Sequence, residues 1–403
     1  MGILVLGLHS NALRAQEESA EDQKIVTVSA QAEMILQGLL NSDSAIKQQN
    51  LLGLATAQEG DIMDGTIGSQ IQFQARVGDY FSGFASVELG EGNGLDSELT
   101  TISFFNFDAQ SASKSATIDQ LWVRGGTQYV SFLFGQVDWI RQFDTNAVAN
   151  SEVYQFLTRS FVTNPVIYGP NGSANTSQGA NRFNTLSLMA IITPSENLEF
   201  KYAVFENDGD MNKIEPKDLV HFAELDMKWG IGENPGNLRV LYTENDGAKT
   251  LFTDGTSSTD TIASVTVNAD QAVGRVSFFG RYGTVLDNRA GMFFSPYTTS
   301  MTMPNWHLSG GLSVKELPLR GEFGLAYGFN HLPTEWQNRI TNAGGTTNPQ
   351  DADKGEQVGE IYYRMKVNDL VSIIPDLIYI QSPAGVEDCK ALFAYSTRVV
   401  VDF

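Results

Sequence analysis

The sequence contains a single cysteine and no long apolar run. Cys389 on its own excludes an intramolecular disulfide and a metal site built from several cysteines. A transmembrane helix needs about 20 consecutive apolar residues, and no stretch of the 403-residue chain supplies them. These absences exclude a disulfide-stapled scaffold and a helical membrane protein. They leave open a membrane β-barrel, because its strands alternate apolar and polar residues and have a moderate mean hydropathy.

Charged residues are also scarce, at 18% of the chain, whereas soluble domains average about 25%. The 26 Lys and Arg residues are outnumbered by 47 Asp and Glu residues, which gives a net charge of −21. This net charge argues against nucleic-acid binding, because neutralising phosphates requires clustered Lys and Arg. With four histidines and one cysteine, we expect neither a metal site nor a cofactor.

The sequence does contain a recurring alternation of apolar and polar residues. In residues 67–77, apolar side chains are separated by glutamines and Arg76, so one face of a strand would contact lipid and the other water. The pair Gly78-Asp79 is a tight-turn signal that leads into a second alternating run at 81–89, and together they predict a hairpin. The same pattern recurs at 26–40, 118–124, 130–137, 184–192, 198–204, 219–229, 237–245, 261–269, 273–285, 305–314, 319–330, 357–366, 370–381 and 390–403.

The connections between these runs alternate in length. Short turns are predicted at 78–79, 125–126, 194–197 and 270–271, and long polar stretches at 91–116, 138–180, 246–258 and 331–355. Short turns at one end and long loops at the other are typical of outer-membrane barrels, which have an even number of strands. We therefore predict an all-β fold, a transmembrane antiparallel β-barrel of sixteen strands forming a single domain over residues 28–403. A partial signal peptide at 1–15 and a flexible tail at 16–27 are expected before it.

The long connection at 138–180 carries its own aromatic residues, which are Trp139, Phe143, Tyr154, Phe156, Phe161 and Tyr168. A solvated linker would not need so many rings, so this loop is predicted to fold against another part of the protein. Its segments FGQVD, FDTNAVANSE, QFL and SFVTNP resemble the signature region of the OprB-like carbohydrate-selective porins. The C-terminal run IIPDLIYIQSPAG…ALFAYSTRVVVDF carries the other half of the resemblance.

This resemblance implies an outer-membrane channel through which small carbohydrates diffuse passively, with the loop at 138–180 folded inward as a constriction. The C-terminal Phe403, at the end of an amphipathic strand, resembles the signal read by the outer-membrane assembly machinery. Porins of this size are usually trimers, so a homotrimer is expected. The expected partners are small sugars, outer-membrane lipid, lipopolysaccharide and the assembly machinery.

Strand alternation places one group of candidate pore-lining residues on the lumen face: Arg76, Glu88, Trp122, Arg124, Arg275, Arg281, Glu322, Glu360, Arg364 and Arg398. An arginine on the lipid face would cost roughly 2–4 kcal/mol near the midplane, which favours inward placement. The loop contributes a second group: Asp138, Arg141, Asp144, Asn146, Asn150, Glu152 and Gln155. Ser151 is a good N-cap and predicts a short helix over 152–158. Both groups either brace the barrel or contact sugar, and Trp122 either stacks on sugar or packs beneath the loop.

Three alternatives to a sugar channel remain open. A general or ion-selective porin would share the barrel, but the acidic composition favours cations while the inward arginines favour anions. A barrel hydrolase could use His307 and Ser309, which lie two apart and share a strand face, although the sequence offers no third orienting group. A structural barrel with a plugged lumen would conduct no ions.

Overall fold

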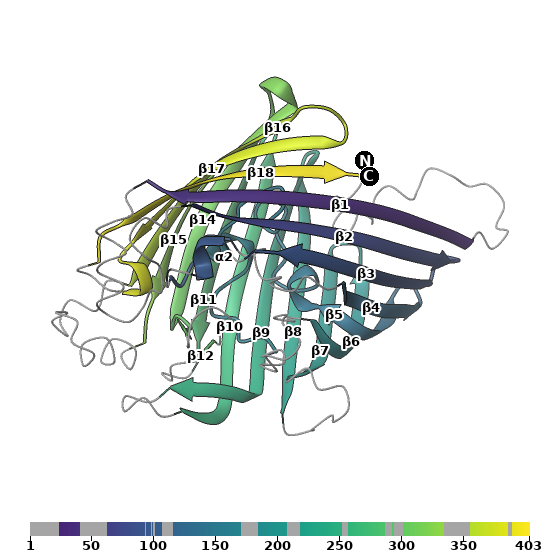
Figure 1. Cartoon of the computed structure of the whole chain (residues 1–403). Helices are drawn as coiled ribbons and strands as arrows, with labels where there is room; N and C mark the ends of the chain where they lie inside the picture. Colours follow the sequence, from purple (N-terminus) through teal and green to yellow (C-terminus); the bar gives the residue numbers. More distant parts are fainter. Residues whose placement is uncertain are drawn as a thin grey trace.

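In a computed structural model the chain forms a closed antiparallel β-barrel (Figure 1). The structure describes residues 24–40, 63–92, 94–97, 99, 101–106, 116–170, 184–207, 218–251, 257–286, 292–293, 301–333, 355–385 and 389–403. Within these ranges, no helix has the length and apolarity needed to cross a membrane. The predicted signal peptide at 1–15 and the end of the predicted loop, 171–180, lie outside the described residues.

Sixteen strands make up the barrel, each pairing with its neighbours in the closed order. They are β1 (Lys24–Leu39), β2 (Met63–Val77), β3 (Phe81–Glu91), β4 (Thr117–Gly126), β5 (Val130–Asp138), β6 (Asn184–Ser195), β7 (Leu198–Glu206), β8 (Leu219–Ile231), β9 (Asn234–Leu251), β10 (Ser257–Val273), β11 (Val276–Val285), β14 (Trp306–Leu317), β15 (Gly321–His331), β16 (Glu356–Lys366), β17 (Val371–Gln381) and β18 (Leu392–Asp402). A separate two-stranded sheet pairs β12 (Met292–Phe293) with β13 (Met301–Thr302). The predicted sixteen-stranded barrel is confirmed.

The first and last strands close the barrel. In the β1–β18 pair, Gln31 lies opposite Asp402 and Leu39 opposite Ala394. The Phe403 N–H donates to the Ala30 carbonyl at 2.8 Å. Because every strand of the barrel has two neighbours, the sheet presents no free edge to other chains.

The alternation predicted from sequence separates the two faces of the wall. Phe73 and Leu121 point outward and are 42% and 55% exposed, as expected for side chains that contact lipid. Gln120 and Trp122 point inward and are only 3% and 8% exposed. A buried lumen face means that other parts of the chain fill much of the barrel interior.

Three boundaries differ from the prediction. The turn expected at 270–271 lies at 274–275, because Gly274 adopts the positive φ of 60° that the tight turn requires. Much of the stretch expected as a loop at 246–258 is strand, since polar side chains do not prevent β9 and β10 from pairing through their backbones. β1 begins at Lys24, within the segment 16–27 expected to be a tail, because residues from Lys24 onward pair with β2.

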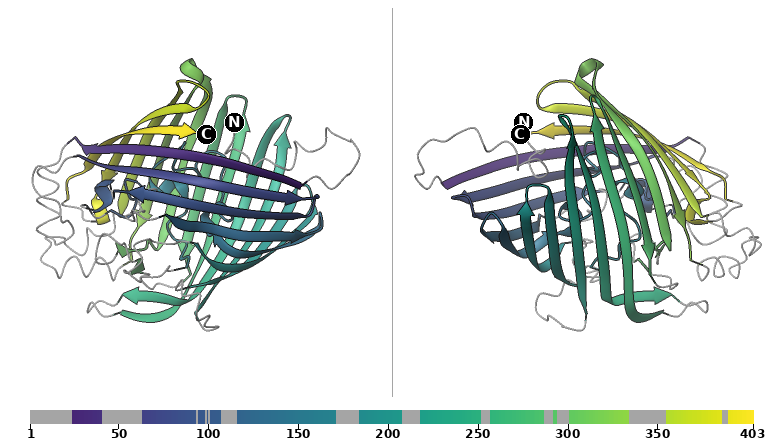
Figure 2. Two further views of the ribbon diagram at one scale, coloured as in Figure 1. Left: turned by 45° about the vertical axis from the view of Figure 1, so that its right-hand side comes forward. Right: turned by 180° about the vertical axis from the view of Figure 1, so that it is seen from behind.

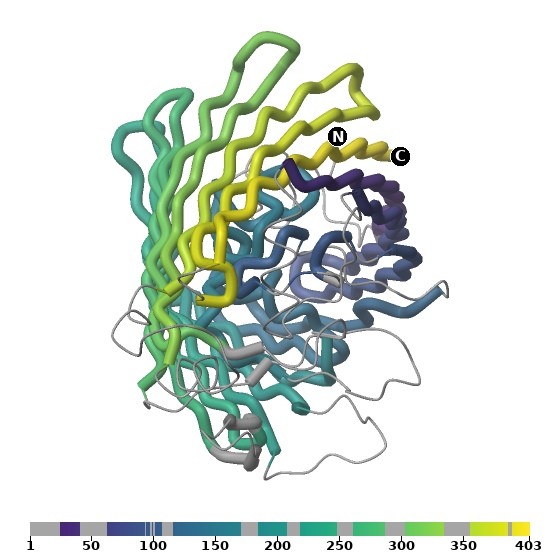
Figure 3. Tube along the Cα trace, turned by 60° about the vertical axis from the view of Figure 1, so that its left-hand side comes forward, coloured from purple at the N-terminus to yellow at the C-terminus, as the bar shows by residue number. Residues whose placement is uncertain are grey.

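Residues 139–170, which lie between β5 and β6, fold into the interior, where blue segments run inside the strongly tilted wall in Figures 2 and 3. These residues, called the inner loop below, include the short helices η3 (Trp139–Arg141) and α2 (Arg159–Val162). Helix α2 replaces the helix predicted at 152–158, where the Ser151 hydroxyl instead accepts the Tyr154 N–H in a turn. Two apolar clusters join the inner loop to the wall.

Candidate functional site

The inner loop begins at the end of β5. The Asp138 side chain caps η3 by accepting the Ile140 N–H at 3.0 Å, and Trp139 and Ile140 are buried. Phe143 then packs edge-on against Phe222 of β8, with ring centroids 5.2 Å apart. Aromatic packing of this kind holds the start of the loop against the β5–β9 side of the barrel.

Asp144 is the main polar anchor on that side. Its N–H donates to Glu224 at 2.7 Å, and its carbonyl accepts from Asn268 at 2.7 Å and from Arg281 at 3.0 Å. Lys201 forms an ion pair with Glu224 at 2.8 Å. Burial raises the pKa of the Asp144 carboxyl, and the nearby Arg281 partly offsets this effect.

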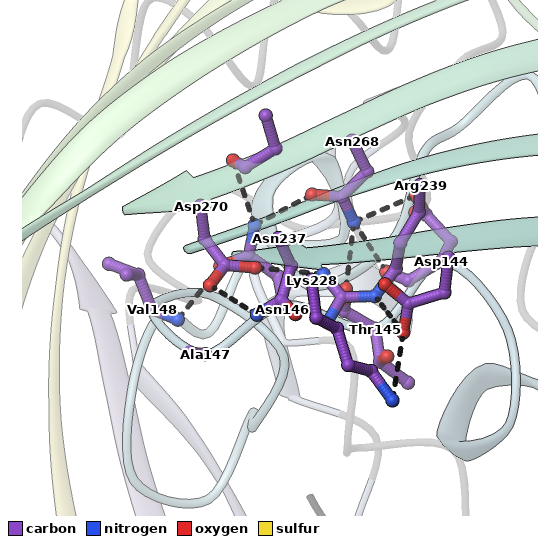
Figure 4. Close-up of polar contacts among 12 residues, drawn as sticks. Asp144, Thr145, Asn146, Ala147, Val148, Lys228, Asn237, Arg239, Asn268 and Asp270 are labelled. Atoms are coloured by element: carbon purple, nitrogen blue, oxygen red, sulfur yellow. Dashed lines mark hydrogen bonds and ion pairs between the residues drawn. The ribbon is translucent and has the colours of Figure 1, made fainter. Parts of the chain in front are cut away.

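The next residues of the loop continue along β10. The Asn146 side-chain nitrogen donates to Asn268 at 2.7 Å, and its side-chain oxygen Oδ1 accepts the Val148 N–H at 2.8 Å (Figure 4). Arg239 and Asp270, drawn beside them, form an ion pair at 2.8 Å on the wall. The polar groups of this part of the loop are therefore satisfied by the wall and by each other.

The second half of the inner loop is anchored on the opposite side of the barrel. Glu360 of β16 accepts the Leu157 N–H at 2.6 Å and the Thr158 N–H at 3.0 Å. Arg398 of β18 donates to the Gln155 carbonyl at 2.6 Å and to the Glu152 carbonyl. Because β8 and β18 are the eighth and sixteenth strands of the closed order, a loop held by both crosses the lumen.

Arg281 and Arg398 are buried cations, and each is held by a carboxylate and by backbone carbonyls of the inner loop. Arg281 donates to the Ala149 carbonyl at 2.8 Å and to the Phe161 carbonyl, and forms an ion pair with Asp144 at 3.3 Å. Arg398 forms an ion pair with Asp376 at 2.7 Å, and both side chains are 0% exposed. These two arginines bind the loop's backbone rather than facing water.

A second segment, described at residues 94–97, 99 and 101–106, also folds inward. Asp96 accepts the Phe105 and Asn106 N–H groups, each at 2.8 Å, and Glu356 of β16 accepts the Ser103 N–H at 2.7 Å. Burial raises the pKa of Asp96 to about 7. The Ser160 hydroxyl donates to the Ser103 hydroxyl at 3.0 Å, so this segment supports the inner loop from one side.

Arg141 is the cation of the inner loop that remains partly open to water. It forms ion pairs with Asp138 at 3.1 Å and with Glu152 at 3.3 Å, and its side chain is 31% exposed. The lumen faces of β2 and of part of β4 carry further half-buried polar residues, Gln70, Gln72, Gln74 and Asp119, here called the open wall. Solvent therefore reaches a polar surface on the loop and another on the wall.

The structure divides the predicted site residues into groups. Asp138, Arg141 and Glu152 come together, whereas Asp144, Asn146, Arg281, Glu360 and Arg398 anchor the loop. Gln155 stabilises the inner loop from within, because its side-chain oxygen accepts the Asn150 N–H at 2.8 Å.

Arg364 forms an ion pair with Glu322 and stacks on Tyr154, with 5.7 Å from its guanidinium carbon to the ring centroid. Glu88 is half-buried on β3, where alternation places it on the same face as Ser86. Trp122 stacks on Phe84 at 5.3 Å and is buried with the start of the loop, which favours packing over sugar stacking.

Three predicted arginines lie away from the loop. Arg76 is 4.0 Å from Asp79 in the β2–β3 turn, and Arg124 donates to Ser131 at 3.0 Å. The prediction for Arg275 was wrong: it lies in the β10–β11 turn, 68% exposed, and pairs with Glu316. Its displacement follows from the shifted turn at Gly274.

Sequence reasoning missed several functional groups. Glu224 and Asn268 anchor the loop, and their only sequence signal is a polar residue on the lumen face of an alternating strand. His307 and Ser309 contact each other at 2.9 Å, and a third group is present, since Asn330 lies 2.7 Å from His307. Asn330 is 23 residues away in sequence, so no local motif could reveal it.

A closed barrel with an apolar outer face and an inward-folded polar loop is the architecture of an outer-membrane diffusion channel, a porin. Residues 73–403 match the sequence family described as carbohydrate-selective porins, the OprB family, and the chain belongs to this family. The protein is thus a passive channel of the bacterial outer membrane for small carbohydrates. A comparison with curated protein sequences found no match.

Solved structures share the fold at low sequence identity. The high-pH structure of Pseudomonas putida OprB has a TM-score of 0.70 and 14% identity, with 94% of each chain covered. The outer-membrane channel DcaP of Acinetobacter baumannii has a TM-score of 0.53 and 12% identity over 94% of this chain and 97% of that one. Salmonella typhi OmpF has a TM-score of 0.53 and 10% identity with the same coverage.

Proposed function

We propose that sugars cross the barrel between the inner loop and the open wall, and that Asp138, Arg141 and Glu152 contact them there. The observation that carries this proposal is the exposure of Arg141, the partly open cation of a loop whose other polar groups are largely held by the wall. Planar guanidinium and carboxylate groups can hydrogen-bond sugar hydroxyls in pairs. A site open to water binds sugar weakly enough to release it, as a channel requires.

The test is single-channel conductance of the refolded protein in a planar bilayer, titrated with mono- and disaccharides. We expect saturable block of the ion current by sugar. Steady conductance without block would leave a general or ion-selective porin, and absence of conductance would favour a plugged barrel.

We propose that the protein performs no chemical step. The His307–Ser309 pair is the strongest hydrolase candidate, but both side chains are buried, at 0% and 4% exposed. Asn330, which orients His307, donates to Ser103 and Ser160, each at 3.1 Å. This cluster is better explained as the point where the two inward-folded segments meet the wall. A serine-reactive probe should therefore leave Ser309 unlabelled in the folded protein.

We also propose a homotrimer and recognition of the C-terminus during assembly. The outer face carries many exposed apolar side chains, which lipid or a second copy could cover. Phe403 pairs with β1 through its backbone, while its residue is 72% exposed, so its ring remains available to the assembly machinery. Cross-linking in native membranes tests the trimer, and assembly yield of Phe403→Ala tests the recognition.

A further inference from the structure

We propose that Asp119, a residue displaced from the strand alternation, sets the charge preference of the sugar path. The path would accept neutral and cationic sugars, such as hexoses and hexosamines, and disfavour anionic ones, such as hexuronates. This inference rests on the proposed sugar path between the inner loop and the open wall.

Asp119 faces the lumen because β4 contains a bulge. Opposite β3, Ser86 pairs with Gln120 and Val87 pairs with Ile118, which leaves Asp119 as an extra residue. Ile118 is 51% exposed on the outer face and Gln120 is 3% exposed on the lumen face. A bulge turns two successive side chains to the same side and so adds a carboxylate to the lumen.

The hydrogen-bond donors around Asp119 are uncharged. Ser86 donates at 2.9 Å and Gln70 at 3.3 Å to one carboxylate oxygen, and Asn184 donates to the other. Gln120 is a fourth donor at 3.5 Å. Neutral donors orient a carboxylate without cancelling its charge, so its field extends into the solvent-filled part of the lumen.

Asn184 gives an independent indication of a ligand beside Asp119. Its residue is 9% exposed, and its side-chain oxygen has no hydrogen-bond partner while its nitrogen holds Asp119. A buried acceptor without a donor is costly. A ligand hydroxyl or ammonium group beside the Asn184–Asp119 pair would donate to both acceptors, whereas an anion would be repelled by the carboxylate.

The arginines that could oppose this charge are already paired. Arg281 and Arg398 are 0% exposed and form ion pairs with Asp144 and Asp376. Arg141 is shared between Asp138 and Glu152, and Asp138 also experiences the charge of Asp119. Arg141 is therefore balanced by two carboxylates, and Asp119 adds a further negative charge near Asp138. Arg76 and Arg124 lie nearer the short-turn end of the barrel.

The experiment compares four variants by reversal potential in a potassium chloride gradient and by current block with a hexose, a hexosamine and a hexuronate. Asp119→Asn removes the charge, Asp119→Glu retains it, and Gln70→Lys places a cation beside the intact carboxylate. Asp79→Asn is the matched control, because this aspartate lies in the β2–β3 turn with its side chain 84% exposed.

We expect the wild type and Asp119→Glu to prefer potassium and to be blocked least by the hexuronate. Asp119→Asn should lower the cation preference about threefold and weaken block by the hexosamine, and Gln70→Lys should do the same even if Asp119→Asn fails to fold. Equal behaviour of Asp119→Asn, Gln70→Lys and Asp79→Asn would overturn the assignment. Absence of any sugar block in the wild type would instead refute the sugar path itself.

Discussion

The two sides of the lumen carry similar polar residues, but these residues differ in burial and in their hydrogen-bond partners. On the wall covered by the inner loop, polar residues such as Arg281, Glu360 and Arg398 are buried and hydrogen-bond to the backbone of the loop. On the open wall, Gln70 and Gln72 are half-buried and bond mainly to each other and to Asp119. An inward-facing polar residue is thus a structural brace or a solute contact depending on whether the loop covers it.

The largest loss of stability is expected when a residue that anchors the inner loop to the covered wall is removed. Arg398→Ala leaves the buried Asp376 carboxylate without its ion pair and should lower the free energy of unfolding by about 3–5 kcal/mol. The loop should also detach from β18, which raises single-channel conductance and weakens sugar block. The control is Arg124→Ala, whose guanidinium bonds to Ser131 and should contribute under about 1 kcal/mol. Similar losses in both variants would contradict the distinction between the two walls.

In the second inward segment, the contribution of Asp96 to the free energy of unfolding should depend on pH. Burial raises its pKa to about 7 from an ordinary value of 3.8, so the folded state binds the proton more tightly than the unfolded state. Its contribution to stability therefore falls as pH rises from about 4 to 7. The difference in thermal stability between Asp96→Asn and wild type should shift in favour of Asp96→Asn across this range. A difference that does not change with pH would contradict the expected titration.

Along the proposed sugar path, Arg141→Gln should weaken sugar binding while changing the free energy of unfolding little. Removing a charged hydrogen-bond donor from a partly exposed site should weaken sugar block by about tenfold, with the unfolding midpoint little changed. The matched control is Arg275→Gln, an exposed turn arginine paired with Glu316. Block unchanged in Arg141→Gln would place the sugar path elsewhere.

The smallest effect is expected at the open wall itself. Gln72 donates to Gln70 at 2.6 Å, and Gln72→Ala removes one neutral contact, so sugar block should weaken by about twofold. Noise analysis of the sugar-dependent current can resolve this change. An effect as large as that of Arg141→Gln would show that the wall contributes as much as the loop.

Strand alternation was sufficient to predict the barrel and the inward direction of Arg281, Glu360 and Arg398. It could not predict their partners, because Arg398 bonds to carbonyls of the inner loop more than 240 residues away. It also missed Asp119, since a bulge of one residue leaves the apolar–polar pattern on either side intact. Arg275 was misplaced for the opposite reason: a turn at Gly274 interrupted what looked like one continuous strand.

The position of the loop anchors has a consequence for the order of assembly. The inner loop is synthesised in the first half of the chain, yet Glu360, Asp376 and Arg398 belong to the last three strands. Contacts this distant in sequence form late, because the whole intervening chain must first be ordered. A barrel that still lacked its C-terminal strands would have no β1–β18 pairing to close it. It would also lack the residues that anchor the second half of the inner loop. Selectivity would therefore arise at the same moment as closure, and an incompletely inserted chain could not be a selective channel.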